Sequence, residues 1–217
     1  MAEKNSNKLI TIMLALIICV AAITILYVNL PKSETNENET DDGTTDQQEN
    51  NDQSEEPTVI LTIIHNDIED EYTLEELEAM DIITGYGGYR TSYPMIKGQG
   101  TYTGVPVSKL VELTAGSITN YSIFVVSNKS GLIQNQTYNY TVVEGNTNIY
   151  NSTNASDETP IGTGGVTMIV CYQKDGEYLD AEKDGDIKIA FVNEDEEKIT
   201  ASGLWWKFVE SIEIIEN

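Results

Sequence analysis

The sequence predicts an α+β domain that is mainly β, with mixed sheets and a few short helices, preceded by one N-terminal transmembrane helix. Short runs rich in β-branched residues recur between turns of Gly, Asp and Asn, and each run predicts a strand. Only two segments have the apolar spacing of a helix, and they do not alternate regularly with the strands. This order excludes a doubly wound α/β fold, which needs a helix between successive strands.

Five runs carry the strand prediction. The folded part begins near Pro57 with "TVILTIIH", and the other runs read "SIFVVS", "VTMIVCY", "DIKIAFV" and "ESIEII" along the chain. β-branched and aromatic side chains favour strands because they fit a pleated, half-buried surface. In this arrangement Cys171 is a buried strand residue, and His65 lies at the end of a strand.

The first helix is predicted in "YTLEELEAM". Thr73 and Glu76 stand three residues apart, which is the spacing of a capping box. Leu74, Leu77 and Met80 then form an apolar stripe, which indicates core packing rather than cofactor binding. A second helix is predicted in "GVPVSKLVELTAG", with a proline near its start and a glycine just past its end.

Between these helices lies "ITGYGGYRTS", residues 83–92, which holds three glycines, two tyrosines and the only arginine of the chain. The composition predicts a tight loop with exposed tyrosines. Glycine also lets a backbone approach a ligand closely, and a lone arginine attracts an anionic group. The same stretch is therefore a candidate ligand cradle.

The charge of the chain excludes several kinds of partner. Its 217 residues allow one sizeable domain plus appendages, and 36 acidic against 12 basic residues give a net charge of −24. Such a surface repels nucleic acid and anionic lipid headgroups, so neither is an expected partner. Because 40% of the residues are apolar, the chain still has enough hydrophobic material for a folded core.

Cysteine and histidine are too scarce for several kinds of site. Cys19 and Cys171 lie far apart in the sequence and neither belongs to a CxxC motif, so we expect no disulfide and no zinc site. With His65 as the single histidine, a catalytic triad is hard to build, and we predict no catalytic residue and no metal ligand. The spacings of dinucleotide-binding, Walker and calcium-binding loops do not occur either.

Residues 9–28, "LITIMLALIICVAAITILYV", form a run of 20 residues without a charge. A helix of this length spans about 30 Å, the thickness of the hydrocarbon core of a bilayer. Lys4 and Lys8 precede the run, so we expect residues 1–8 in the cytoplasm and the C-terminal part outside the cell, on a single-pass anchor in the cell membrane. A cleaved signal peptide is the alternative, but the run is long and no A-x-A site follows it. A lipid-modified Cys19 is the weaker option, because the small residues expected before such a cysteine do not precede it.

Residues 29–56 are predicted to be an acidic, disordered tether. Between Lys32 and Glu56, ten acidic residues face one lysine and no aromatic residue occurs. Such a segment cannot bury enough apolar surface to fold, and its charges repel one another and extend it. Residues 57–217 then form a domain that is held away from the membrane.

Six N-x-Ser/Thr sequons occur between residues 120 and 154, on the side of the membrane predicted to lie outside the cell. They are candidate N-glycosylation sites in a host that has the machinery. The asparagines are Asn120, Asn128, Asn135, Asn139, Asn151 and Asn154, and a further sequon at Asn38 lies in the tether.

Five segments spread over residues 57–217 carry a resemblance to a known family. In order they read "YTLEELEAM", "YTGVPVSKLVELTAG", "NYTVVEGNTNIYN", "VTMIVCYQKDGEYLDAEKDGDIKIAFV" and "LWWKFVESIEI". Together they resemble the molybdopterin-binding domain of the sulfite oxidase family, particularly its short, single-domain prokaryotic members. The resemblance implies the mixed α+β fold of that family with its compact β-rich core, and it raises molybdopterin as a candidate cofactor.

The resemblance also gives the glycine-rich stretch a specific meaning. In catalytic members the corresponding loop reads approximately Cys-Ala-Gly-Asn-Arg, and the Cys thiolate binds molybdenum. In this chain Gly88 and Arg90 match that loop, but Tyr86 stands at the metal-ligand position. A phenol is a poor substitute for a soft thiolate. The sulfite pocket of the family also uses several arginines, whereas this chain has one.

Three hypotheses for the function follow. The leading one is a non-catalytic binding or interaction module for a small organic ligand or a cell-surface protein. Its candidate binding residues are Tyr86, Gly88, Tyr89, Arg90 and Tyr102. The second hypothesis is a molybdopterin-dependent oxidoreductase that holds its cofactor through backbone amides and Arg90, without a thiolate. The third is a glycosylated structural protein of the cell envelope.

Overall fold

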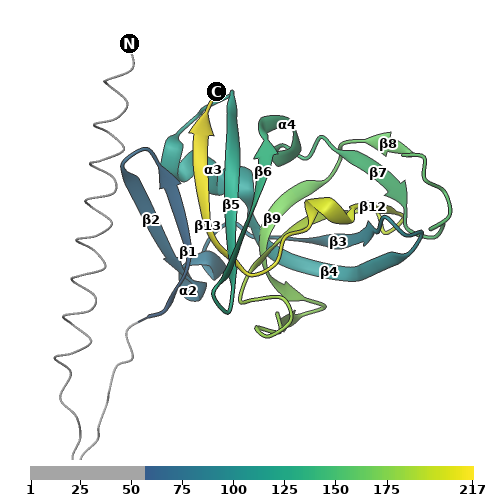
Figure 1. The fold of residues 1–217 in the computed structure, drawn as a ribbon, viewed down its shortest axis with the longest axis horizontal. Helices are drawn as coiled ribbons and strands as arrows, with labels where there is room; N and C mark the ends of the chain where they lie inside the picture. Colours follow the sequence, from purple (N-terminus) through teal and green to yellow (C-terminus); the bar gives the residue numbers. More distant parts are fainter. Residues whose placement is uncertain (1–56) are drawn as a thin grey trace, which may run out of the picture. The chain divides into compact units, whose positions relative to one another are not determined.

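The computed structural model describes residues 57–217, which form two β-sheets with short helices packed against them (Figure 1). The predicted transmembrane helix at residues 9–28 and the predicted tether at residues 29–56 lie outside the described residues. Within residues 57–217, no helix is both long enough and apolar enough to cross a membrane. The domain is mainly β, as the sequence predicts, and both of its sheets contain a parallel and several antiparallel pairs.

The first sheet has five strands, in the order β2 (Ile68–Thr73), β1 (Val59–His65), β13 (Val209–Glu216), β5 (Tyr121–Lys129) and β6 (Leu132–Asn139). β1 and β13 pair in parallel, and the other neighbours pair antiparallel. A two-residue turn of Ser130 and Gly131, both at positive φ, joins β5 to β6. The edges of this sheet are therefore β2 and β6.

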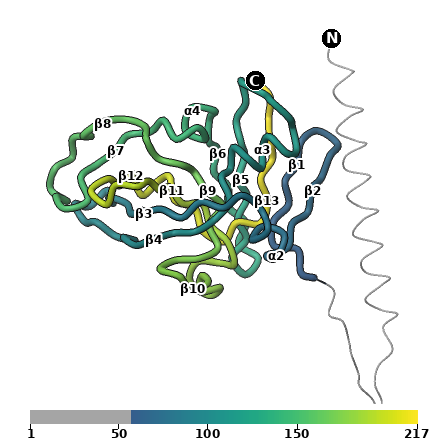
Figure 2. The backbone as a smooth tube through the Cα atoms, turned by 180° about the vertical axis from the view of Figure 1, so that it is seen from behind, coloured from purple at the N-terminus to yellow at the C-terminus, as the bar shows by residue number. Residues whose placement is uncertain are grey.

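The second sheet is curled. Its strands are β3 (Ile83–Arg90), β4 (Ile96–Pro106), β7 (Asn148–Asn151), β8 (Gly162–Thr163), β9 (Thr167–Lys174), β10 (Glu177–Tyr178), β11 (Lys188–Asn193) and β12 (Lys198–Ala201). β3 pairs with β4, β4 with β9, β9 with β11, and β11 with β3, so these four strands close into a ring. β12 pairs in parallel with β3, and β7 and β8 extend the sheet from there, as the view from behind in Figure 2 shows.

Four short helices complete the domain: α2 (Leu74–Glu78), α3 (Val107–Ala115), α4 (Tyr140–Val143) and the 3-10 helix η1 (Ser202–Leu204). Both hydrogen bonds of the predicted capping box between Thr73 and Glu76 are formed at the start of α2. α3 begins after Pro106 and ends before Gly116, so the second predicted helix is confirmed as well. Leu110 of α3 is fully buried in the core.

Alternating side chains divide the buried residues into two clusters. On β9, Val170 belongs to the large core between the two sheets, whereas its neighbours Ile169 and Cys171 belong to a smaller cluster on the other face of the curled sheet. The smaller cluster also contains Tyr102, with Trp205 packed against it. Cys171 is fully buried, which confirms its prediction as a buried strand residue.

The glycine- and tyrosine-rich stretch is strand β3, and its prediction as a loop is wrong. Its glycines allow close contacts between strands. A Cβ on Gly85 would lie 2.9 Å from the carbonyl oxygen of Asn193, and a Cβ on Gly87 would lie 2.8 Å from that of Phe191. Both carbonyls belong to β11, so these glycines let β11 approach β3 and close the ring. Glycine marks turns and close backbone approaches alike, and composition alone does not distinguish them.

Candidate functional site

The structure does not bring the five predicted binding residues together in one pocket. Tyr89 and Tyr102 line one pocket, whereas Tyr86, Gly88 and Arg90 do not. All five come from β3 and β4, which pair with each other. Tyr86 and Tyr89 are half-buried, so the expectation of exposed tyrosines in β3 is wrong.

Arg90 already has partners within the protein. Its Nη2 donates to Glu158 Oε1 at 3.0 Å, and its Nε donates to the Ala155 carbonyl at 3.3 Å. The guanidinium carbon also lies 5.7 Å from the centre of the Tyr150 ring. The side chain is only 12% exposed. These contacts fasten the segment between β7 and β8 to β3, which gives the only arginine of the chain a structural role.

Tyr86 and Gly88 also take part in contacts within the domain. Gln99 Nε2 donates to the Tyr86 hydroxyl at 2.9 Å and to the Ser152 carbonyl at 3.2 Å. A Cβ on Gly88 would lie 3.0 Å from the Ile199 side chain and 3.1 Å from that of Gln99. Protein side chains therefore fill the space beside this glycine.

The pocket that contains Tyr89 and Tyr102 has a volume of about 160 Å³. Three aromatic rings form its wall. The ring of Trp205 lies 5.3 Å from that of Tyr89 and 5.1 Å from that of Tyr102, measured between ring centres. Trp205 Nε1 donates to Thr200 Oγ1 at 2.8 Å, and the Tyr102 hydroxyl donates to the Gly98 carbonyl. Because the polar groups of Trp205 and Tyr102 are hydrogen-bonded inside the domain, these two rings offer apolar surface to the pocket.

Three lysines reach the same pocket from three segments: Lys174 ends β9, Lys188 begins β11, and Lys207 precedes β13. The Nζ atoms of Lys188 and Lys207 both contact Asp184 Oδ1, at 3.1 and 3.0 Å. Lys174 Nζ lies 3.6 Å from Asp175 Oδ2, outside the pocket lining. Three ammonium groups and one carboxylate thus line the pocket, and the lining carries an excess of positive charge. We call this site the lysine pocket.

Lys188 is the buried member of the lysine pocket, with a side chain only 7% exposed. Its neighbours Ile187 and Ile189 belong to the large core. Since side chains alternate along a strand, Lys188 points to the opposite face, toward the smaller cluster. Its Nζ lies 4.9 Å from the centre of the Tyr102 ring, within the range of a cation–π interaction. A positive charge is therefore held against the aromatic wall.

The charge states in the lysine pocket follow from these contacts. Burial acts to raise the pKa of the Asp184 carboxyl, but hydrogen bonds from Lys207 and Lys188 outweigh it, and the net shift of this pKa is downward. Asp184 is therefore ionised at neutral pH and draws the two ammonium groups together. Burial raises the pKa of the Tyr102 hydroxyl well above its ordinary value, so this ring remains neutral.

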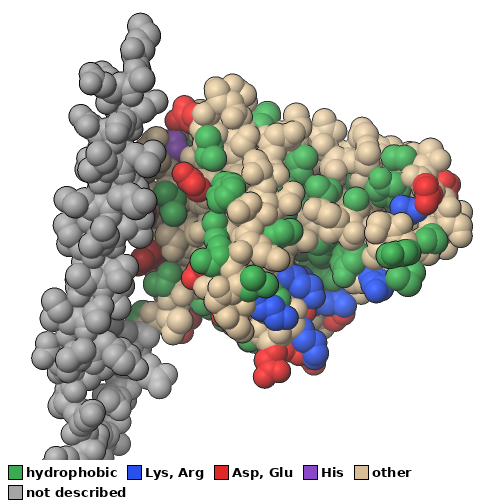
Figure 3. All heavy atoms as spheres, in the orientation of Figure 1, with side chains coloured by type: hydrophobic (Ala, Val, Ile, Leu, Met, Phe, Trp, Pro, Cys, Tyr) green, Lys and Arg blue, Asp and Glu red, His purple; other side chains and the backbone are tan. Residues whose placement is uncertain are grey.

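The lysine pocket contrasts with the rest of the domain. Residues 57–217 contain nine basic and 25 acidic residues, which gives a net charge of −16. Three of those basic residues line this one pocket. On the face that Figure 3 shows, several Lys and Arg side chains gather in one region, with acidic side chains beside them. The domain thus concentrates positive charge locally while its overall field is negative.

Sequence reasoning missed the residues of the lysine pocket other than the two tyrosines. Asp184 lies in the acid-rich segment "DGEYLDAEKDGD" and contacts both Lys188 and Lys207. One signal was present in the sequence: Lys188 interrupts the apolar strand run "DIKIAFV". A lysine is almost never fully buried without a partner, so its position predicts a nearby carboxylate.

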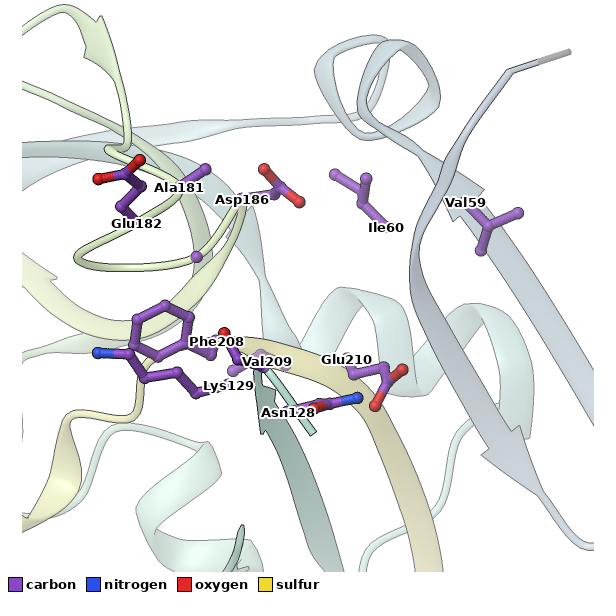
Figure 4. Close-up of a pocket in the computed structure, with 12 residues that line it drawn as sticks. Val59, Ile60, Asn128, Lys129, Ala181, Glu182, Asp186, Phe208, Val209 and Glu210 are labelled. Atoms are coloured by element: carbon purple, nitrogen blue, oxygen red, sulfur yellow. The ribbon is translucent and has the colours of Figure 1, made fainter. Parts of the chain in front are cut away.

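A second hollow, of about 330 Å³, lies beside the end of the first sheet (Figure 4). Lys129 Nζ lies 4.7 Å from the centre of the Phe208 ring on one side of it. Glu182, Asp186 and Glu210 also line this hollow, and all three are exposed to solvent. One lysine among three solvated carboxylates provides no set of converging donors for an anion, and this hollow is a weaker candidate site.

The described residues do not fit molybdopterin. Tyr86, which the sequence resemblance aligns with a metal-ligand position, accepts a hydrogen bond from Gln99, and side chains fill the space beside Gly88. Burial raises the pKa of the Cys171 thiol to about 12, so this cysteine is protonated at neutral pH and presents no free thiolate. Within residues 57–217, no three His, Cys, Asp or Glu side chains are grouped so as to hold a metal ion.

Comparisons with known proteins give a distant similarity. No protein-family model matches the chain, and no curated protein matches it. Among solved structures, one that resembles it is the sulfane dehydrogenase SoxCD from Paracoccus pantotrophus, with 14% sequence identity and a TM-score of 0.48. The match covers 72% of this chain and 38% of that chain, so the chain spans well under half the length of that structure. This is a distant likeness of fold, and it assigns no residue and no activity.

Proposed function

We propose that residues 57–217 form a non-catalytic binding module that takes a small organic anion in the lysine pocket. The observation that carries this proposal is the convergence of Lys174, Lys188 and Lys207 on a pocket walled by aromatic rings. Ammonium groups select an anionic group, and ring surface selects an apolar or aromatic body. The ligand class is therefore a single-ring organic molecule that carries a carboxylate or a phosphate.

The hydrogen-bonding capacity of the lysines supports an anionic ligand. Each ammonium group has three donors. Lys188 Nζ donates to Asp184, and Lys207 Nζ contacts Asp184 and donates to the Lys183 carbonyl at 3.2 Å. Donors therefore remain for an incoming anion. A charge-assisted hydrogen bond is about twice as strong as a neutral one, so even a small anion gains affinity and orientation here.

The size of the lysine pocket limits the ligand. Its volume of about 160 Å³ is roughly half of the lower end of the range for drug-sized ligands, about 300–1,000 Å³. A single ring with one anionic group matches this volume better than a dinucleotide or a whole pterin cofactor. Tyr89, Tyr102 and Trp205 would stack or pack edge-on against such a ring.

The location and the fold type of the module are part of the proposal. The uncharged run at residues 9–28, with Lys4 and Lys8 before it, supports a membrane anchor with the domain outside the cell. The five segments described above support a domain related to the molybdopterin-binding domain of the sulfite oxidase family. A tyrosine stands at the metal-ligand position of that family, and Arg90 is bonded within the domain. Both observations support a module that does not perform the molybdenum chemistry of the family.

The sequons belong to the same proposal. Of the six asparagines between residues 120 and 154, all but Asn151 are exposed. In a host that glycosylates asparagine outside the cytoplasm, these side chains are accessible acceptors. Glycans there would surround an acidic domain on a tether, which suits a protein of the cell surface.

Tryptophan fluorescence provides the test, because Trp205 lines the lysine pocket and Trp206 is the only other tryptophan. Phenyl phosphate should produce a saturable change in fluorescence, phenol a much weaker one, and inorganic phosphate an intermediate one. Lys207→Met should weaken phenyl phosphate binding by about tenfold, since a hydrogen bond to a charged group contributes about 1.5 kcal/mol or more.

Lys109→Met is the matched control, because it removes the same charge from α3, where this side chain is 38% exposed and does not line the pocket. It should leave the affinity unchanged. Equal affinities for phenyl phosphate and phenol, or equal losses in the two variants, would contradict the proposal. Metal analysis of protein from the native host separates the module from an oxidoreductase: one molybdenum per chain would favour the enzyme.

A further inference from the structure

β6 is an edge strand of the first sheet, and its sequence "LIQNQTYN" contains no charged residue. It pairs with β5 on one side, and no strand within residues 57–217 pairs with it on the other. Leu132 and Ile133 at its start are 61% and 66% exposed. An uncharged edge with exposed apolar residues is unusual in a domain with a net charge of −16, and it is open to another strand.

The turn between β5 and β6 determines which backbone groups of β6 point outward. Lys129 and Leu132 flank this two-residue turn, and such a flanking pair exchanges hydrogen bonds. Bonded and non-bonded pairs alternate along an antiparallel ladder. The N–H and C=O groups of Ile133, Asn135 and Thr137 therefore face away from β5. Among the described residues, no backbone hydrogen bond from elsewhere in the chain occupies these outward groups.

The opposite edge of the same sheet is protected by charge. β2 carries Glu69, Asp70 and Glu71 within its six residues. Acidic side chains on an edge strand oppose pairing with another acidic chain. β6 lacks this protection, so the two edges differ in the property that controls strand pairing. Of the two edges of this sheet, β6 is the one at which no like charges would meet between two copies.

The side chains of β6 are complementary to themselves. Gln134, Asn135 and Gln136 carry amides, and an amide both donates and accepts hydrogen bonds. A two-fold symmetric interface needs a patch of this self-complementary kind. A basic peptide, which would be the partner attracted by an acidic domain, finds no carboxylate on β6. The chemistry of the strand therefore favours a second copy of the same chain.

We propose that β6 is a self-association surface, at which two copies pair their β6 strands antiparallel and join two five-stranded sheets into one. One strand pair buries a small area, so the dimer is weak in solution. Two copies in one membrane would meet at a higher effective concentration. An N-glycan at Asn135 would cover this edge, so the dimer forms from unmodified chains.

Cysteine cross-linking of the full chain in membrane vesicles tests the proposal. Asn135→Cys is combined with Cys19→Ala, so that Cys171, which is fully buried, is the one natural cysteine left. A short bismaleimide should convert this variant into a species of twice the chain mass. Glu71→Cys on the opposite edge is the matched control and should remain monomeric.

A second variant tests whether the loss of β6 pairing can occur without a loss of folding. Thr137 is exposed on β6, so Thr137→Lys should leave the thermal unfolding of the chain unchanged. It places like charges at the paired edge and should lower the yield of the Asn135→Cys dimer by about fivefold. Equal cross-linking from Asn135→Cys and Glu71→Cys, an unchanged yield in Thr137→Lys, or a product that contains a different protein would overturn the proposal.

Discussion

Replacing Gly87 by alanine should reveal what the glycines of β3 do. The new Cβ would lie 2.8 Å from the Phe191 carbonyl oxygen, and 3.0 Å from both the Trp205 and the Tyr102 rings. Real Cβ atoms essentially never come within 3.0 Å of such a neighbour. The carbonyl belongs to the paired strand β11 and cannot rotate away, so the ring of strands must shift.

The magnitude follows from the kind of neighbour. Overpacking a well-packed core costs about 1–3 kcal/mol, and a rigid backbone contact places Gly87→Ala in the upper half of that range. With a urea m-value of about 2 kcal/mol per molar, the unfolding midpoint should fall by about 1 M. The measurement is urea unfolding of the full chain in detergent, followed by tryptophan fluorescence and circular dichroism.

Gly203→Ala provides the matched control. No atom lies within 4 Å of a Cβ at Gly203, and its φ lies outside the left-handed region. An alanine there should be neutral or stabilise the domain by about 0.4–1 kcal/mol, because it restricts the unfolded chain. If Gly87→Ala lowers the free energy of unfolding by less than about 0.5 kcal/mol, the glycines of β3 are not needed for contact between strands. Ligand binding would then be the better explanation for these glycines.

Three further predictions concern the lysine pocket and the topology. Asp184→Asn should raise the affinity for phenyl phosphate about fivefold, since both ammonium groups then turn to the ligand, and calorimetry that finds weaker binding would contradict this. Because the pKa of Asp184 is lower in the folded state, its contribution to stability is present above its unfolded pKa of about 4 and is lost as the pH falls through the folded pKa. Between neutral and acidic pH, the urea midpoint of unfolding should therefore fall less steeply for Asp184→Asn than for the unaltered protein. Equal falls in the two proteins would count against a stabilising role for the Asp184 carboxylate. Protease added to spheroplasts should remove residues 57–217, and full protection would disprove the predicted topology.

Much of the fold could be predicted from local patterns. The five β-branched runs are strands and both predicted helices form, because in each of them the periodicity agrees with the burial that tertiary packing imposes. The other strands were missed because their composition suggests turns or solvated segments. β6 is rich in Asn and Gln, β2 in acidic residues, and β3 in glycine, and neighbouring strands hold each of them in place.

The candidate site depended more strongly on tertiary structure. Tyr89 and Tyr102 share a pocket because β3 pairs with β4, whereas Arg90 one residue later points to the segment between β7 and β8. The meeting of Lys188 and Lys207 at Asp184 requires β11 and the start of β13 to lie together. No spacing in the sequence encodes that meeting, although the charge of Lys188 inside an apolar strand indicated that a partner must exist.

A crystal structure of the protein with phenyl phosphate would show whether the lysine pocket is the binding site, because it locates the ligand itself. We expect the phosphate within hydrogen-bond distance of Lys188 Nζ and Lys207 Nζ, with the phenyl ring against Trp205. Phenyl phosphate bound elsewhere, with Lys188 and Lys207 contacting Asp184 and no ligand, would contradict the assignment of this pocket as the binding site.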